Sequence, residues 1–147
     1  MLNEALPKRI RYPHAGVEEA LLEGFLPITR MPRLADALLD NDLDTVSVPE
    51  SVMVRLQFRQ DGPGRVLVVG EAQFEQQWRC QRCLEAVLLH SGCEIEMVLA
   101  SHKKVIEQLR SDQDSLLTDG DLVDTADIIE DPLLLALPMS PKHEDCD

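Results

Sequence analysis

The chain has 147 residues, a mass of 16.5 kDa and a formal net charge of −13. That length suits one domain, and we expect a single domain over residues 1–147 whose core forms without disulfide bonds. No apolar run approaches the roughly 18 residues of a membrane span, and no secretory signal follows the basic N-terminal residues. We therefore expect a cytoplasmic protein with no membrane partner, whose four cysteines are thiols or metal ligands.

Acidic residues gather near the C-terminus, where the last 37 residues hold eleven Asp and Glu against one Lys. We expect an N-terminal segment over 1–20, an acidic loop over 111–120 and an acidic tail over 139–147. The acidic quarter is open to two interpretations, a solvated segment or a surface for a basic partner protein. Phosphate contacts need Lys and Arg, so this quarter is a poor binder of duplex nucleic acid. Aromatic residues are only 3% of the whole chain, which argues against a stacking surface for single-stranded nucleic acid.

The first predicted elements are a strand, a helix and a second strand. Residues 21–29 are strand-like, and residues 31–39 show helical spacing with Pro32 suited to a first turn. From Val46 the apolar period becomes two, so residues 52–58 predict a strand with one apolar face. Asp61-Gly62-Pro63-Gly64 then predicts a tight hairpin turn.

The clearest strand is residues 65–79, and a third alternating segment follows over residues 87–99. Residues 121–137 predict a C-terminal helix that Asp124 or Thr125 begins, with Pro132 either kinking it or opening a new turn. We therefore predict an α+β fold: an antiparallel β-meander, open or barrel-like, with one helix after the first strand and a C-terminal helix.

Cys80 and Cys83 form a CxxC motif between the second and third meander strands, and His143 and Cys146 repeat that spacing. Three thiolates and one imidazole would complete a closed tetrahedral zinc site that ties the tail to the hairpin. Unliganded reduced thiols are an equally good interpretation, and a disulfide or redox pair is a poorer one, because a strand rather than a helix follows the motif.

The hairpin also offers a small contact surface, because Trp78, Arg79 and Arg82 flank the cysteines. Trp78 either stacks on a partner or packs in the core, since it falls on the apolar face of its strand. Glu130 and Asp131 are adjacent carboxylates, which in so acidic a segment need no acid–base role. The chain has no glycine-rich phosphate loop, nucleophile elbow or HExxH motif, so we expect no enzymatic activity.

Two motifs resemble those of the bacterial YceD family, the large ribosomal RNA subunit accumulation proteins. The first is Trp78-Arg79-Cys80-Gln81-Arg82-Cys83-Leu84, and the second runs from Glu130 to Pro138 as E-D-P-L-L-L-A-L-P, followed by His143 and Cys146. The resemblance spans roughly residues 20–146 and departs from the family pattern at Pro132. The residues it singles out are Cys80, Arg82, Cys83, Glu130, Asp131, Leu135, Pro138 and Cys146.

The resemblance implies a role in the synthesis, processing or stability of large-subunit ribosomal RNA. Our hypothesis is a non-enzymatic ribosome-biogenesis factor that contacts a ribosomal RNA precursor or a basic assembly protein. Its expected partner-binding residues are Trp78, Arg79, Arg82, Glu130 and Asp131, and its expected cofactor is at most one structural zinc. The alternative is an acidic module that sequesters or chaperones a basic protein and affects the RNA only indirectly.

Overall fold

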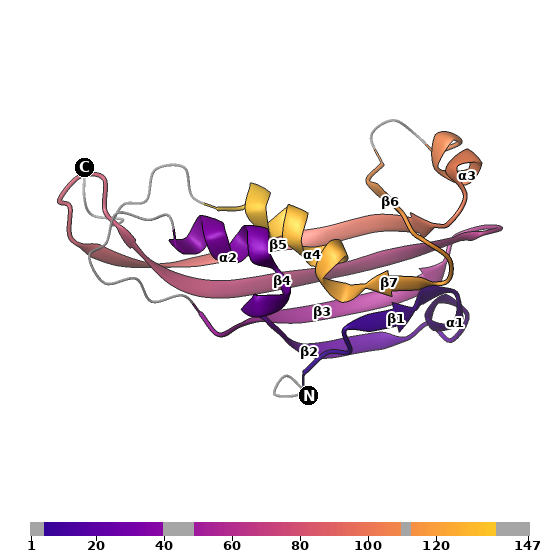
Figure 1. Ribbon diagram of the computed structural model, residues 1–147, viewed down its shortest axis with the longest axis horizontal. Coiled ribbons are helices and arrows are strands. Elements are labelled where there is room, and N and C mark those ends of the chain that lie inside the picture. The colour runs from indigo at the N-terminus through magenta and orange to yellow at the C-terminus, as the bar shows by residue number, and fades with distance from the viewer. Residues whose placement is uncertain (1–4, 40–48, 110–112, 138–147) are drawn as a thin grey trace.

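The computed structural model describes residues 5–39, 49–109 and 113–137. Its main feature is a five-stranded sheet in the order β2-β3-β4-β5-β6 (Figure 1). The strands are β2 (Leu21–Pro27), β3 (Ser51–Gln60), β4 (Arg65–Arg79), β5 (Ala86–Ala100) and β6 (Ser115–Leu117). Strands β2 to β5 pair antiparallel in sequence order, whereas β6 adds to β5 in parallel. The α+β class and the antiparallel meander are thus confirmed, and the described sheet is open rather than a closed barrel.

The sheet buries one face, as the alternating sequence predicts. Within β4, Val68, Ala72 and Phe74 are buried while Glu71 and Gln73 are exposed. The turn between β3 and β4 places two glycines at positive φ, Gly62 at 130° and Gly64 at 72°. Residues with side chains rarely adopt those angles, so the glycines allow the predicted hairpin to close.

Helices cover the buried face (Figure 1). They are α2 (Pro32–Leu39) and α4 (Thr125–Leu135), whereas the short η1 (Ile28–Arg30) leads into α2 and α3 (Lys103–Glu107), beside β6, has no buried residue. Leu34 and Leu38 of α2 and Ile129 and Leu133 of α4 are fully buried, so these two helices supply much of the apolar layer over the sheet. The helix expected over residues 31–39 is therefore confirmed, with Pro32 in its first position.

A second, two-stranded sheet joins the two ends of the described chain. Strand β1 (Arg9–Arg11) pairs antiparallel with β7 (Leu122–Asp124), and α1 (Tyr12–Val17) follows β1 directly. The Tyr12 hydroxyl is 2.8 Å from the Thr118 hydroxyl, and the Thr125 hydroxyl donates to the Pro7 carbonyl at 2.6 Å. These contacts fix the start of α4 against the N-terminal segment.

Two sequence expectations need correction here. Residues 115–117, expected in a surface loop, form the edge strand β6 because they continue the sheet beside the end of β5. The C-terminal helix begins at Thr125, as expected, but Leu122, expected on its apolar face, lies in β7 because residues 122–124 pair with β1. Asp124 is the helix N-cap residue, as expected, although its side chain makes no capping hydrogen bond, and Pro132 lies inside the helix.

Candidate functional site

The turn between β4 and β5, residues 80–85, carries the CxxC motif at one end of the sheet. Cys80 donates its N–H to the Glu85 carbonyl at 2.8 Å and accepts from the Leu84 N–H at 3.0 Å. Leu84 has a positive φ of 66°, which tightens the turn. Cys80 is buried and Cys83 is exposed, and both are thiols without a disulfide bond. The turn therefore presents one thiol to solvent and one to the interior.

The expected zinc ligands are only partly described. His143 and Cys146 lie outside the described residues, as does Pro138 of the second motif. Within residues 5–39, 49–109 and 113–137, no three His, Cys, Asp or Glu side chains gather closely enough to hold a metal ion. A complete Cys3His site would need both undescribed ligands, so zinc stays a prediction.

Two basic residues, Arg79 at the end of β4 and Arg82 within the turn, have different environments. Arg79 is half-buried and donates from Nε to the Leu84 carbonyl at 3.4 Å, whereas Arg82 is exposed. Trp78 is only 7% exposed and belongs to the core, so its ring does not lie on the surface. Arg79 and Arg82 are thus the residues of this turn that can offer positive charge to a partner.

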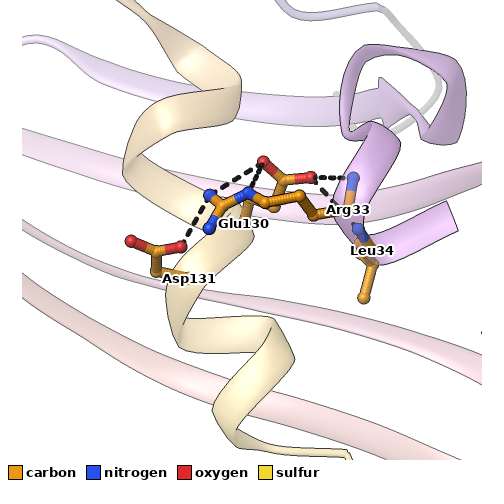
Figure 2. Close-up of polar contacts among 4 residues, drawn as sticks. All are labelled: Arg33, Leu34, Glu130 and Asp131. Atoms are coloured by element: carbon orange, nitrogen blue, oxygen red, sulfur yellow. Dashed lines mark hydrogen bonds and ion pairs between the residues drawn. The ribbon is translucent and has the colours of Figure 1, made fainter. Parts of the chain in front are cut away.

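Glu130 and Asp131 of α4 meet the first turn of α2 through Arg33 (Figure 2). Glu130 Oε2 accepts from the backbone N–H groups of Arg33 at 2.8 Å and Leu34 at 3.1 Å. Glu130 Oε1 accepts from Arg33 Nε at 3.2 Å and Nη2 at 3.1 Å. Arg33 Nη2 is also 2.6 Å from Asp131 Oδ1. We call Arg33, Glu130 and Asp131 the interhelical clamp.

The clamp explains how α2 begins without an acidic residue of its own in its first turn. The N–H groups at the start of a helix have no partner within the helix and carry partial positive charge. The Glu130 carboxylate accepts hydrogen bonds from two of them. Hydrogen bonds to Asp131 and then to Glu130 raise the pKa of Arg33. The Glu130 side chain is 6% exposed and already occupied, whereas that of Asp131 is 64% exposed and accessible to a partner.

Arg33 is a residue that the sequence analysis does not identify. The available signal is the start of α2, where Pro32 and Arg33 open a helix that lacks an acidic cap. Such a start needs an acceptor from elsewhere in the chain. The sequence alone leaves open which of its 27 acidic residues supplies that acceptor.

Asp127 shows how closely negative charges are spaced along α4. Burial, followed by the charges of Asp124 and Glu130, raises the pKa of Asp127. An acid with a raised pKa in the folded state destabilises the fold once the pH exceeds its unfolded value, and the penalty is complete above the raised pKa. We therefore expect Asp127→Asn to raise the free energy of unfolding above that of the original chain, and to raise it by more at pH 7 than at pH 3. Urea unfolding at both pH values measures this difference, and equal effects at the two pH values would contradict it.

The chain matches a known protein family. The family model described as "Large ribosomal RNA subunit accumulation protein YceD" matches residues 68–147. The matched segment includes most of β4, the cysteine turn, β5 and all of α4. Neither the curated proteins nor the solved structures give a match. None of the described helices is long and apolar enough to span a membrane.

Proposed function

The chain belongs to the YceD family, and from that premise we propose that it is a cytoplasmic, non-enzymatic factor that supports the synthesis, processing or stability of large-subunit ribosomal RNA. The observation that carries this proposal is the family match over residues 68–147, which spans both motifs noted in the sequence. The clamp occupies the Glu130 carboxylate in holding two helices together, so Asp131 is the residue of this pair that is offered to a partner.

The contact surface in this proposal is the cysteine turn, where Arg82 is exposed and Arg79 is half-buried. Two guanidinium groups suit an RNA phosphate or an acidic patch on an assembly protein. Asp131 offers a carboxylate of opposite charge on α4, although Arg33 already contacts it at 2.6 Å. The proposed partner is a ribosomal RNA precursor or a protein bound to it.

Recovery of ribosome precursors with the tagged protein tests this surface. The double variant Arg79→Glu and Arg82→Glu is expected to lose association because four units of charge change at the turn. The matched control is Lys103→Glu and Lys104→Glu, which makes the same charge change on exposed positions of α3. Unchanged recovery with the first variant, or equal loss with the control, would count against the turn as the contact.

A structural zinc held by Cys80, Cys83, His143 and Cys146 is part of the same proposal. Its support is that Cys80 and Cys83 share one tight turn as thiols without a disulfide bond. Elemental analysis of the purified protein is expected to give about one zinc per chain, lost in Cys80→Ser and kept in Cys93→Ser. Protein without zinc, or a Cys80→Ser variant with full zinc, would refute the site.

The second candidate function is an acidic module that binds a basic protein, with indirect effects on the RNA. A specific observation favours it: Asp119, Asp124 and Asp127 line one shallow pocket of about 410 Å³, in which Arg9 contacts Asp124 Oδ1 at 3.1 Å and leaves Asp119 and Asp127 to a basic partner. Neutralising Asp119, Asp121, Asp124 and Asp127 would then abolish a salt-sensitive protein interaction. Crosslinking separates the two functions, since this one predicts no direct contact between the chain and RNA.

A further inference from the structure

Strand β5 has a long edge that no described strand covers. Strand β6 pairs only with Val98–Ala100, although β5 begins at Ala86. Val98 donates its N–H to the Asp114 carbonyl at 2.9 Å, and the Ala100 carbonyl accepts from the Thr118 N–H at 2.8 Å. The even-numbered residues of β5 therefore direct their backbone groups away from β4. Glu96, Glu94 and Gly92 continue that phase, so their N–H and C=O groups form a sheet edge to which no strand of the described residues pairs.

A groove follows this edge between β5 and α4. Its volume is about 420 Å³. Its apolar walls are Ile95 and Met97 of β5 and Pro132 and Leu135 of α4. Leu135 is 88% exposed, an unusual degree of exposure for a leucine beside a groove. The edge thus combines unpaired backbone groups with apolar surface on one side, which is what an added strand requires.

The groove is also strongly acidic. Glu94, Glu96, Asp114 and Asp131 line it, and its described lining contains no Lys or Arg. The Glu94 and Glu96 side chains are exposed, so each is available to a basic side chain of an incoming segment. Arg33 reaches Asp131 from outside the lining, and the other three carboxylates make no ion pair among the described residues, although Arg55 lines a separate hollow with Glu94 and Glu96.

A second copy of the chain is a poor occupant of this edge. Two β5 edges pairing antiparallel would bring Glu94 and Glu96 of one copy against those of the other, and each chain carries a net charge of −13. Like charges directly opposite in a sheet destabilise the pairing. A basic extended segment would pair favourably with this edge. Its alternate Lys or Arg side chains would face the glutamates, and the apolar side chains between them would enter the groove.

We infer that the free edge of β5 from Gly92 to Glu96 binds a lysine- or arginine-rich extended segment of a partner protein as an added strand. This inference deepens the proposed function, because it names the chemical class of a protein partner. It rests on the proposed function only in assigning that partner to ribosome assembly. The backbone edge supplies affinity, and the glutamates select for positive charge.

A synthetic nine-residue peptide of alternating Lys and Val tests the inference with the purified full-length chain. Isothermal titration is expected to show salt-sensitive binding. N-methylation of alternate backbone amides along one edge keeps the peptide's charge but removes its donors, and should weaken binding about ten-fold or more. Equal affinity for both peptides would overturn strand addition, and so would no binding at all.

Matched variants and a footprint locate the site. Glu94→Gln with Glu96→Gln should weaken binding at least about five-fold and reduce its salt dependence, whereas Glu75→Gln with Glu107→Gln should not. Cys93 also lines the groove, so bound peptide should slow its alkylation while leaving that of Cys83 unchanged. Equal loss in both double variants, or an unprotected Cys93, would overturn the assignment.

Two further outcomes complete the test. Light scattering that shows the chain alone to be a dimer with a protected Cys93 would overturn the inference in favour of a second copy. Failure of peptide binding alongside normal recovery of ribosome precursors would overturn the β5 edge while the proposed function stands. Normal peptide binding without any recovery of precursors would overturn the proposed function while the β5 edge stands. The failure of one proposal can therefore be distinguished from the failure of the other.

Discussion

Replacing Gly70 with alanine is expected to lower the free energy of unfolding by about 3 kcal/mol or more. Gly70 lies in β4 opposite Leu56 of β3 and Ile95 of β5. A Cβ atom at this position would be 1.9 Å from the Arg55 carbonyl oxygen and 2.9 Å from the Arg55 carbonyl carbon. Backbone atoms in the middle of a sheet cannot move away without breaking the ladder of β3, so the clash is costly.

The matched control is Gly92→Ala in the neighbouring strand. A Cβ atom there would meet its nearest neighbour, the Ala72 carbonyl oxygen, at 3.3 Å, which a small shift can accommodate. Urea unfolding of both variants gives the comparison. A Gly70→Ala protein as stable as Gly92→Ala would mean that β3 and β4 are not packed as closely as the structure has them.

Removing the Glu130 carboxylate is the second change with a large expected effect. Glu130→Ala should lower the free energy of unfolding by about 3 kcal/mol, because it leaves two backbone N–H groups at the start of α2 without their charged acceptor. The Glu130 side chain is only 6% exposed, so water cannot fully replace it. Glu130→Gln keeps an acceptor oxygen and should lose less stability.

Asp131→Asn is the natural control for Glu130, since the two residues are adjacent and both contact Arg33. Asp131 is 64% exposed, and exposed ion pairs contribute little to stability. Asp131→Asn should therefore shift the urea concentration at the unfolding midpoint several-fold less than Glu130→Ala does. Equal effects of the two substitutions would show that the clamp acts through surface charge rather than by capping α2.

The sheet was predictable where periodicity and local turns determine it. In β4, the two-residue period from Val66 to Trp78 identifies both the strand and its buried face. The two glycines between β3 and β4 identify the hairpin. These signals are local, and pairing between sequential antiparallel strands needs little further information.

The short strands were not predictable, because their pairing is between distant parts of the chain. Strands β1 and β7 have three residues each, and Ile10 meets Val123 across more than a hundred positions. Three residues carry no periodicity, and Leu122 also fits the helical spacing of Ala126 and Ile129. The tertiary pairing with β1 therefore overrides a local pattern that favours helix.

The candidate site also has one part that the sequence predicts and another that it does not. The turn with Cys80 and Cys83 is visible in the sequence because the two cysteines interrupt a strand pattern. The role of Glu130 is not visible, since its partners in α2 lie almost a hundred residues away. The β5 edge is also hidden from the sequence, because only the shortness of β6 leaves Glu94 and Glu96 on a free strand.

A role in large-subunit ribosomal RNA accumulation is best tested by the ratio of large- to small-subunit ribosomal RNA in cells lacking this protein. We expect the ratio to fall when the gene is removed. The original chain and the Lys103→Glu, Lys104→Glu control should restore the ratio, but the Arg79→Glu, Arg82→Glu variant should not. A ratio that does not change on removal of the gene would contradict the account.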